Sequence, residues 1–260
     1  MNHKPLILVT NDDGIDAPGI RNLIHAMRGL GEIVVVAPDT PQSGKSHSIT
    51  INVPLRYKNG IREEDYVEYS CNGTPVDCVK LAVKIILDRK PDLLVSGINH
   101  GSNASINVIY SGTMAAVIEG TFEGIPSVGF SLDDFSNDAD FTVAAKVAKL
   151  VALKVLEKGL PDDVCLNVNI PAIASEKIKG FKICRQAKGI WEESFETRVD
   201  PHKKHYYWLT GEFKSLDSGV DTDDYALNEG YVAIVPVHCD LTAYNSLQQI
   251  SDWNLNFNNE

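Results

Sequence analysis

Short apolar runs alternate with amphipathic helical patterns along the first part of the chain. The runs are rich in β-branched residues and lack polar alternation, which is the pattern of strands covered on both faces. Strands and helices that alternate in this way build a doubly wound, mainly parallel sheet. We predict strands at residues 6–9, 33–37, 92–96, 127–132 and 165–170. We predict helices at residues 19–30, 77–87, 114–123 and 139–158.

The last third of the chain has another pattern, with strands predicted at residues 181–186, 195–199, 205–210 and 231–237. Residues 200–204 form the predicted tip of a long, aromatic-rich hairpin. Because such a hairpin is not stable alone, we expect it to pack on a partner subunit. The alternative is a hairpin that folds back onto its own domain. The prediction is one three-layer α/β domain over residues 1–260, with a hairpin extension for oligomerisation within about 180–245.

Net charge limits the possible partners. The chain has 24 Lys and Arg residues against 35 Asp and Glu residues, a formal net charge of −11 at pH 7. Binding of a nucleic-acid polymer depends on clustered Lys and Arg, so the acidic charge argues against this class of partner and we expect none. A small phosphorylated substrate is still allowed, because a bound metal ion can supply positive charge locally.

The cysteines bear on the cellular compartment. There are five, an odd number, and no C-x-x-C pair occurs, which argues against a disulfide framework and against a zinc site. We expect buried free thiols in a reducing compartment. The first residues hold no basic leader, and no apolar run reaches membrane-spanning length. We therefore expect a cytoplasmic protein without membrane contact.

Two adjacent carboxylates, Asp12 and Asp13, follow the first predicted strand. In a doubly wound sheet, ligands bind beyond the carboxyl ends of the strands. Neighbouring strand residues point to opposite faces, so both carboxylates can face one ion only if the chain turns, which Gly14 permits. The pair repels itself unless a cation binds beside it. A divalent-metal site is one interpretation, and an ordinary Asx turn with a helix cap is the other.

The loop after the second predicted strand, residues 37–48, is rich in hydroxyl groups and contains Ser43. Its segment Gly44-Lys45-Ser46 resembles the end of a P-loop, but that motif requires a glycine five residues earlier, where this chain has Asp39. A P-loop is therefore excluded. Lys45 and His47 either contact an anion or are simply solvated.

The loop after the third predicted strand, residues 96–103, contains Asn99 and closely spaced glycines. Asp12, Asp13, Ser43 and Asn99 together offer hard oxygen ligands, which suit Mg²⁺ or Mn²⁺ and not zinc.

A predicted anion site follows in the sequence. Ser111-Gly112-Thr113 opens the helix predicted at 114–123, and the backbone N–H groups of a helix N-terminus bind anions. Capping by Ser111 or Thr113 alone is the structural alternative, and capping is compatible with phosphate binding.

These loops resemble those of the SurE family of 5′/3′-nucleotidases, over residues 6 to about 245. The matching motifs occur in order and at matching intervals: Thr10-Asn11-Asp12-Asp13-Gly14, Gln42-Ser43-Gly44, Asn72-Gly73-Thr74-Pro75, Ser96-Gly97-Ile98-Asn99-His100-Gly101-Ser102-Asn103 and Tyr110-Ser111-Gly112-Thr113. Later segments that match are Thr222-Asp223 and Asn228-Glu229-Gly230-Tyr231. Many members carry a basic residue where this chain has Thr40, so the resemblance does not extend to a phosphate contact there.

The resemblance implies a metal-dependent phosphomonoesterase that acts on nucleoside monophosphates and, in some members, on polyphosphate. It implies one Mg²⁺ or Mn²⁺ ion per subunit and a homodimer or homotetramer. The implied metal ligands are Asp12, Asp13, Ser43 and Asn99. The implied phosphate contacts are Asn103, Ser111, Gly112 and Thr113.

Our mechanistic hypothesis is that the metal ion activates a water molecule and neutralises a phosphoryl oxygen, while Asn103 and the helix N-terminus hold the other oxygens. Asp12 or Asp13 accepts the proton from the water, and the sequence does not choose between them. The catalytic residues would then be Asp12, Asp13 and Asn103.

Two other enzyme classes lack their sequence signatures in this chain. A phosphatase that forms an aspartyl-phosphate usually has a second Asp two positions after the nucleophile, where this chain has Gly14 or Ile15. A dehydrogenase requires G-x-G-x-x-G after the first strand, which is absent from the sequence. A non-catalytic nucleotide sensor on the same fold stays open, and a phosphate-release assay separates it from an enzyme.

Overall fold

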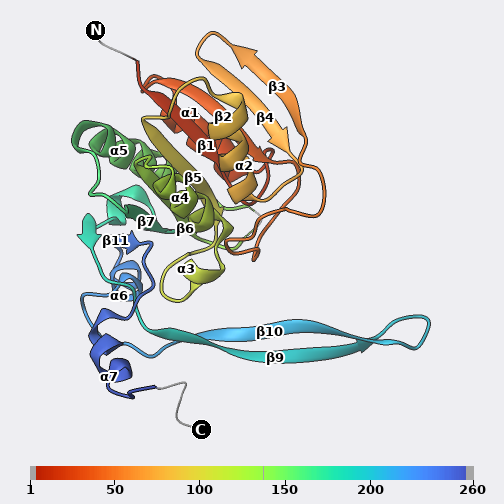
Figure 1. The fold of residues 1–260 in the computed structure, drawn as a ribbon, viewed down its shortest axis with the longest axis vertical. Coiled ribbons are helices and arrows are strands. Elements are labelled where there is room, and N and C mark those ends of the chain that lie inside the picture. Colours follow the sequence, from red (N-terminus) through yellow and green to blue (C-terminus); the bar gives the residue numbers. More distant parts are fainter. Residues whose placement is uncertain (1–3, 137, 256–260) are drawn as a thin grey trace.

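A mostly parallel sheet forms the centre of the fold in the computed structural model, which describes residues 4–136 and 138–255 (Figure 1). Within these residues, nine strands lie in the order β3-β4-β2-β1-β5-β6-β7-β11-β8. Only β3 and the β11–β8 pair run against the direction of their neighbours β4 and β7. The strands of the sheet are β1 (Leu6–Thr10), β2 (Glu32–Pro38), β3 (Tyr57–Glu63), β4 (Tyr66–Cys71), β5 (Leu93–His100), β6 (Ser127–Asp133), β7 (Val164–Pro171), β8 (Phe181–Ile183) and β11 (Val232–His238).

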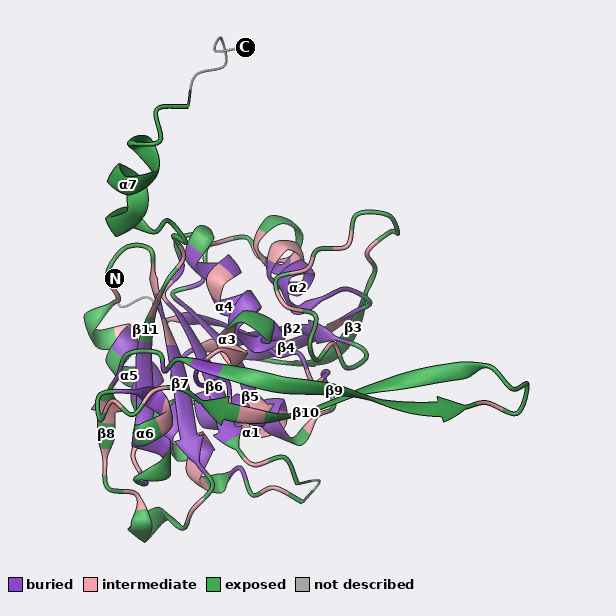
Figure 2. Cartoon of the chain, turned by 90° about the horizontal axis from the view of Figure 1, so that it is seen from below, coloured by how far each residue is buried: buried purple, intermediate pink, exposed green. Residues whose placement is uncertain are grey.

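Helices cover both faces of this sheet and make three layers. Alternate residues of β1 show the division: Ile7 and Val9 belong to the core under α1 and α5, whereas Leu6 and Leu8 belong to the core under α2 and α4. Figure 2 shows the sheet as the buried part of the molecule. The helices are α1 (Pro18–Met27), α2 (Pro75–Leu81), α3 (Asn107–Tyr110), α4 (Gly112–Phe122), α5 (Thr142–Lys158), α6 (Asp223–Asn228) and α7 (Leu247–Ser251). The predicted doubly wound α/β class is confirmed.

Several boundaries differ from the prediction. Strand β5 continues to His100 instead of ending at Ser96, with a shift in its pairing to β6 between Ser96 and Asn99. Gly97, at a φ of 121°, provides the backbone conformation of this irregularity. The helix predicted at 77–87 begins at Pro75 and closes with a π-helical turn, Ala82–Ile86. The β3–β4 hairpin, α3, α6 and α7 were not predicted.

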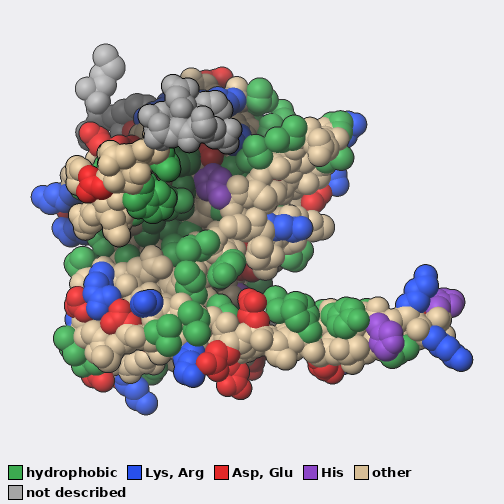
Figure 3. All heavy atoms as spheres, turned by 60° about the horizontal axis from the view of Figure 1, so that its bottom comes forward, with side chains coloured by type: hydrophobic (Ala, Val, Ile, Leu, Met, Phe, Trp, Pro, Cys, Tyr) green, Lys and Arg blue, Asp and Glu red, His purple; other side chains and the backbone are tan. Residues whose placement is uncertain are grey.

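A second, two-stranded sheet is the predicted hairpin, longer than expected. Strands β9 (Gly189–Val199) and β10 (His205–Ser215) pair antiparallel over their whole length. The hairpin extends away from the body, and exposed hydrophobic side chains lie along it (Figures 1 and 3). Phe195 is 65% exposed and Trp208 57%. The alternative prediction, a hairpin folded back onto its own domain, is therefore wrong.

Two further expectations concern the described residues as a whole. All five cysteines are free thiols, and four of them are buried, as predicted. Among the helices of residues 4–136 and 138–255, none is long and apolar enough to cross a membrane.

Asp223 fastens the base of the hairpin to the body. Its buried carboxylate accepts backbone hydrogen bonds from Ser105 at 2.9 Å and from Ala187 at 2.8 Å. In Asp223→Ala these two N–H groups lose their acceptor, and a buried unpaired N–H costs about 1–3 kcal/mol. We expect the free energy of unfolding to fall by about 3 kcal/mol in urea denaturation. Asp224→Ala is the control, since only the backbone of Asp224 is bonded there, and a similar loss in both variants would contradict the prediction.

Candidate active site

Hydrogen bonds join the polar loops at the carboxyl edge of the sheet. The N–H of Gln42 donates to the Asp12 carbonyl oxygen at 2.7 Å, which fastens the loop after β2 to the loop after β1. The N–H of His100, at the end of β5, donates to Asp13 Oδ2 at 3.2 Å. The Ser46 hydroxyl donates to the carbonyl oxygen of Ile109 in α3 at 2.5 Å. The loops after β1 and β2, the end of β5 and helix α3 therefore form one surface, as the strand-end argument predicted.

Asp12 is the buried centre of this surface, with 3% of its area exposed. The Thr113 hydroxyl donates to its Oδ1 at 2.5 Å. Burial, and then the neighbouring Asp13, raise the pKa of Asp12 to about 6. Burial also raises the pKa of Asp13. Within the described residues, neither carboxylate has an ion pair with Lys or Arg, so their charges are uncompensated by the chain itself.

The N-terminus of α4 packs directly on Asp12. Ser111 is the N-cap, and its hydroxyl accepts from the N–H of Met114 at 3.0 Å. Gly112 follows, so close that a Cβ there would lie 2.7 Å from Asp12 Cβ. Ser111 therefore caps the helix, which is the structural alternative that the sequence suggested for this segment. Thr113, predicted to contact phosphate, is fully buried and directs its hydroxyl at Asp12.

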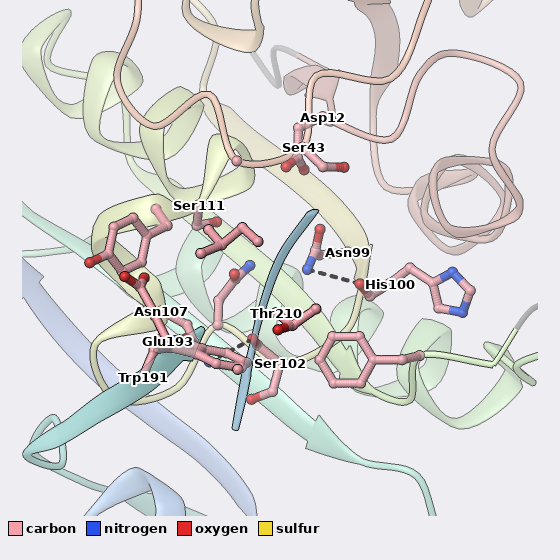
Figure 4. Close-up of a pocket in the computed structure, with 16 residues that line it drawn as sticks. Asp12, Ser43, Asn99, His100, Ser102, Asn107, Ser111, Trp191, Glu193 and Thr210 are labelled. Atoms are coloured by element: carbon pink, nitrogen blue, oxygen red, sulfur yellow. Dashed lines mark hydrogen bonds between the residues drawn. The ribbon is translucent and has the colours of Figure 1, made fainter. Parts of the chain in front are cut away.

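Asn99 and Ser43 complete the oxygen-rich group around Asp12. The Asn99 amide nitrogen donates to the carbonyl oxygen of Gly101 at 2.6 Å. Its Oδ1 therefore points the other way, 3.5 Å from the Thr113 hydroxyl. Figure 4 shows Ser43 beside Asp12, with Asn99 across from both. Asp12, Ser43 and Asn99 line the same cavity, whereas Asp13 is not among its lining residues and accepts the backbone N–H of His100.

A cavity of about 630 Å³ opens over this group, a volume suited to a small organic ligand. It extends from Asp12 to the base of the hairpin (Figure 4). Among the described residues that line it, none is Lys or Arg. The lining residues are Asp12, Ser43, Gly44, Asn99, His100, Ser102, Asn103, Asn107, Tyr110, Ser111, Phe135, Trp191, Glu193, Leu209, Thr210 and Gly211.

The donor set fits a hard divalent cation. Two carboxylates without a cationic neighbour, an amide oxygen and a hydroxyl are the ligand types of Mg²⁺ and Mn²⁺. Within the described residues, no group of three or more His, Cys, Asp and Glu side chains could hold a metal ion. Within those residues, this excludes a metal site built only from His, Cys, Asp and Glu side chains. The set at Asp12 is of a different type, because Ser43 and Asn99 contribute neutral oxygens to it.

Asn103 lines the cavity and is held by polar side chains that the sequence analysis missed. Its amide nitrogen donates to Ser131 Oγ at 2.8 Å, and its backbone N–H donates to Asn169 Oδ1 at 2.8 Å. Asn167 donates to its carbonyl oxygen at 2.8 Å. The alternation of Asn167 and Asn169 in an otherwise apolar strand was the available signal. Buried side-chain amides require hydrogen-bond partners, and Asn167 and Asn169 find theirs in the backbone of Asn103 at the cavity.

Two residues of the second loop have roles outside the cavity. His47 Nε2 lies 3.1 Å from Glu119 Oε2, and Lys45 is exposed. Neither is among the residues that line the cavity. The hairpin residues Trp191, Glu193 and Thr210 were also missed, because their sequence pattern gives no sign of where the strands cross the sheet edge.

The fold and site define a doubly wound α/β protein with an acidic, oxygen-rich cavity at the carboxyl edge of its sheet. The sequence profile of the family described as Survival protein SurE matches residues 7–193. The chain belongs to the SurE family.

Known relatives are similar over nearly the whole chain. A protein of Flavobacterium psychrophilum named 5′-nucleotidase SurE is 60% identical over 97% of this chain and 99% of its own. One of Christiangramia forsetii with the same name is 58% identical over 97% and 98%. The crystal structure of the SurE protein from Aquifex aeolicus superposes with a TM-score of 0.83 at 40% identity, covering 96% of this chain and 100% of that one.

Proposed function

We propose that this protein is a metal-dependent 5′-nucleotidase that hydrolyses nucleoside 5′- and 3′-monophosphates to nucleoside and phosphate. The relatives named 5′-nucleotidase SurE support this activity. The observation that carries it is the pair Asp12 and Asp13, without a Lys or Arg partner in the described chain, beneath the N-terminus of α4. A phosphate monoester in that cavity requires a cation that the lining residues do not supply.

The proposed cofactor is one Mg²⁺ or Mn²⁺ ion per subunit, held by Asp12, Asp13, Ser43 and Asn99. When bound, such an ion supplies positive charge to a phosphoryl oxygen and lowers the pKa of a water molecule. The carboxylates of Asp12 and Asp13 bring the negative charge that selects a divalent cation.

The chain itself orients the substrate. The N-terminus of α4, at Ser111 and Gly112, carries the positive end of the helix dipole and favours a phosphoryl oxygen, whereas the N–H of Thr113 already donates to Asp12. Ser111 and Asn103 line the cavity and provide further polar contacts. Asp12 or Asp13 accepts the proton of the attacking water. Fixed donors of this kind stabilise the transition state without reorganisation during the reaction.

Phosphate release tests the proposal. We expect release from AMP and GMP with Mn²⁺ or Mg²⁺, and loss of release with EDTA that returns when metal is added. Nucleotide binding without phosphate release under either metal would instead favour the sensor. No finding from the relatives supports that alternative.

Thr113 orients a proposed metal ligand and gives a separate test. In Thr113→Val the side-chain shape is kept, but Asp12 loses its hydroxyl donor. We expect the Kd for Mn²⁺, measured by calorimetry, to rise about tenfold, as is usual when a partner of a metal ligand is lost. Thr121→Val is the matched control in the same helix, since that hydroxyl donates to Val117 O and not to Asp12. An equal Kd in the two variants would contradict this role.

The hairpin supports a homodimer or homotetramer as the functional assembly. Its exposed aromatic side chains resemble an apolar surface that a partner covers. The free thiols are consistent with the proposed cytoplasmic location. Sedimentation at micromolar concentration, with and without residues 194–210, tests the assembly, and a wild-type monomer would refute it.

A further inference from the structure

One wall of the cavity is formed by the base of the hairpin, and the proposed chemistry does not use it. Trp191 and Glu193 lie two residues apart on β9, so their side chains share one face of the strand. Both line the cavity. Figure 4 shows them on the far side of the cavity from Asp12 and Ser43. A ligand whose phosphate lies at α4 therefore places its other end against these two residues.

Trp191 presents a fixed aromatic surface. Its Nε1 donates to Asn107 Oδ1 at 2.8 Å, and its ring lies edge-on to Phe213 with centroids 5.9 Å apart. Contacts from α3 and β10 thus set the orientation of the indole, which stays 38% exposed. A preoriented indole at a cavity wall is a stacking surface for a nucleobase, and it accepts any base because every base has a π-face.

Glu193 adds a carboxylate to this wall of the cavity. Within the described residues it has no hydrogen bond or ion pair, whereas its neighbour Glu192 pairs with Lys214 Nζ at 2.7 Å. The residue opposite Glu193 across the hairpin is Gly211, which has no side chain to cover it. A carboxylate repels phosphate and accepts hydrogen bonds only. A ligand group that contacts Glu193 must therefore be a hydrogen-bond donor, which a base edge with N–H groups supplies and a second phosphate does not.

We propose that Trp191 and Glu193 form a base subsite that selects guanine. This inference rests on the proposed nucleotidase function and names its substrate class. Guanine carries two adjacent donors, N1–H and the N2 amino group, which match the two oxygens of one carboxylate. Adenine and cytosine place a ring-nitrogen acceptor beside their amino group, and uracil flanks its N–H with carbonyl oxygens. Each of these three directs lone pairs at Glu193.

The test compares kcat/KM for GMP, IMP and AMP at saturating Mn²⁺. IMP keeps N1–H and lacks the N2 amino group. We expect kcat/KM for GMP to exceed that for AMP about tenfold, with the value for IMP between them. A tenfold effect is at the low end for a paired, charge-assisted contact, because Glu193 is accessible to solvent. In Glu193→Gln the ratio of GMP to AMP should fall close to one, with the change mainly in KM.

Glu192→Gln is the matched control, because that side chain lies next in sequence on the other face of β9 and does not line the cavity. Its ratio of GMP to AMP should equal that of the wild type. Equal kcat/KM for the three nucleotides in the wild type, or an unchanged ratio in Glu193→Gln, would overturn the base subsite. Turnover of none of them would instead overturn the proposed function.

Discussion

Asp12→Asn is expected to lower kcat by about 1,000-fold at saturating Mn²⁺, the rate equivalent of several kcal/mol of charge stabilisation. The substitution keeps the shape of the side chain and removes one of the two negative charges. Because burial already disfavours the charged form of Asp12, the neutral amide should not unfold the protein. Steady-state phosphate release from GMP measures the loss, and thermal denaturation checks the fold.

Asp16→Asn provides the control for that experiment. Asp16 belongs to the same loop, but its side chain is 95% exposed and lies 3.6 Å from Arg21. This variant should retain wild-type kcat. A kcat above one tenth of the wild type in Asp12→Asn would rule out Asp12 as a ligand on which the reaction depends.

Gly112→Ala is expected to lower kcat/KM by about 100-fold, the effect of misplacing a reacting group by about 1 Å. The new Cβ would lie 2.7 Å from Asp12 Cβ and 2.9 Å from its Oδ2, so the carboxylate must move. Alanine is otherwise favourable in a helix, so the loss reports on the position of Asp12 and not on helix propensity.

Gly120→Ala separates this effect from simple overpacking. Gly120 lies in the same helix, and its Cβ would lie 2.5 Å from Ser127 Oγ and 2.7 Å from Leu94 Cδ1. We expect lower stability with an unchanged Kd for Mn²⁺, whereas Gly112→Ala should raise that Kd. Equal metal affinity in the two variants would show that Gly112 does not control the carboxylate.

The sequence was sufficient for the middle strands of the sheet, β2, β1, β5, β6 and β7, because those strands are buried on both faces. Runs such as residues 33–37 contain only apolar side chains, and a strand buried on both faces is the element that fits such a short run best. Strand β3 is the opposite case. All its residues from Tyr57 to Glu63 are exposed, and Lys, Asn, Gly and Arg leave no periodic apolar signal. It is a strand only because β4 provides a backbone partner.

The same distinction applies to the site. Asp12, Ser43 and Asn99 could be grouped from the sequence, because the carboxyl ends of parallel strands meet at one edge. The structure brings these three to one cavity. Trp191 and Glu193 could not be placed, because their position depends on contacts such as Trp191 with Asn107, 84 residues away. Long-range side-chain contacts leave no periodicity in the chain.

Strands β9 and β10 form one continuous ladder from the cavity wall to a tip far from the body. If a second subunit covers the outer part of the hairpin, nucleotide binding at the cavity and subunit binding at the outer hairpin are coupled by one free energy. Linkage then requires reciprocity: the factor by which assembly tightens nucleotide binding equals the factor by which nucleotide tightens assembly. Dilution of such an enzyme would raise its apparent KM, so specific activity would depend on protein concentration even with excess metal.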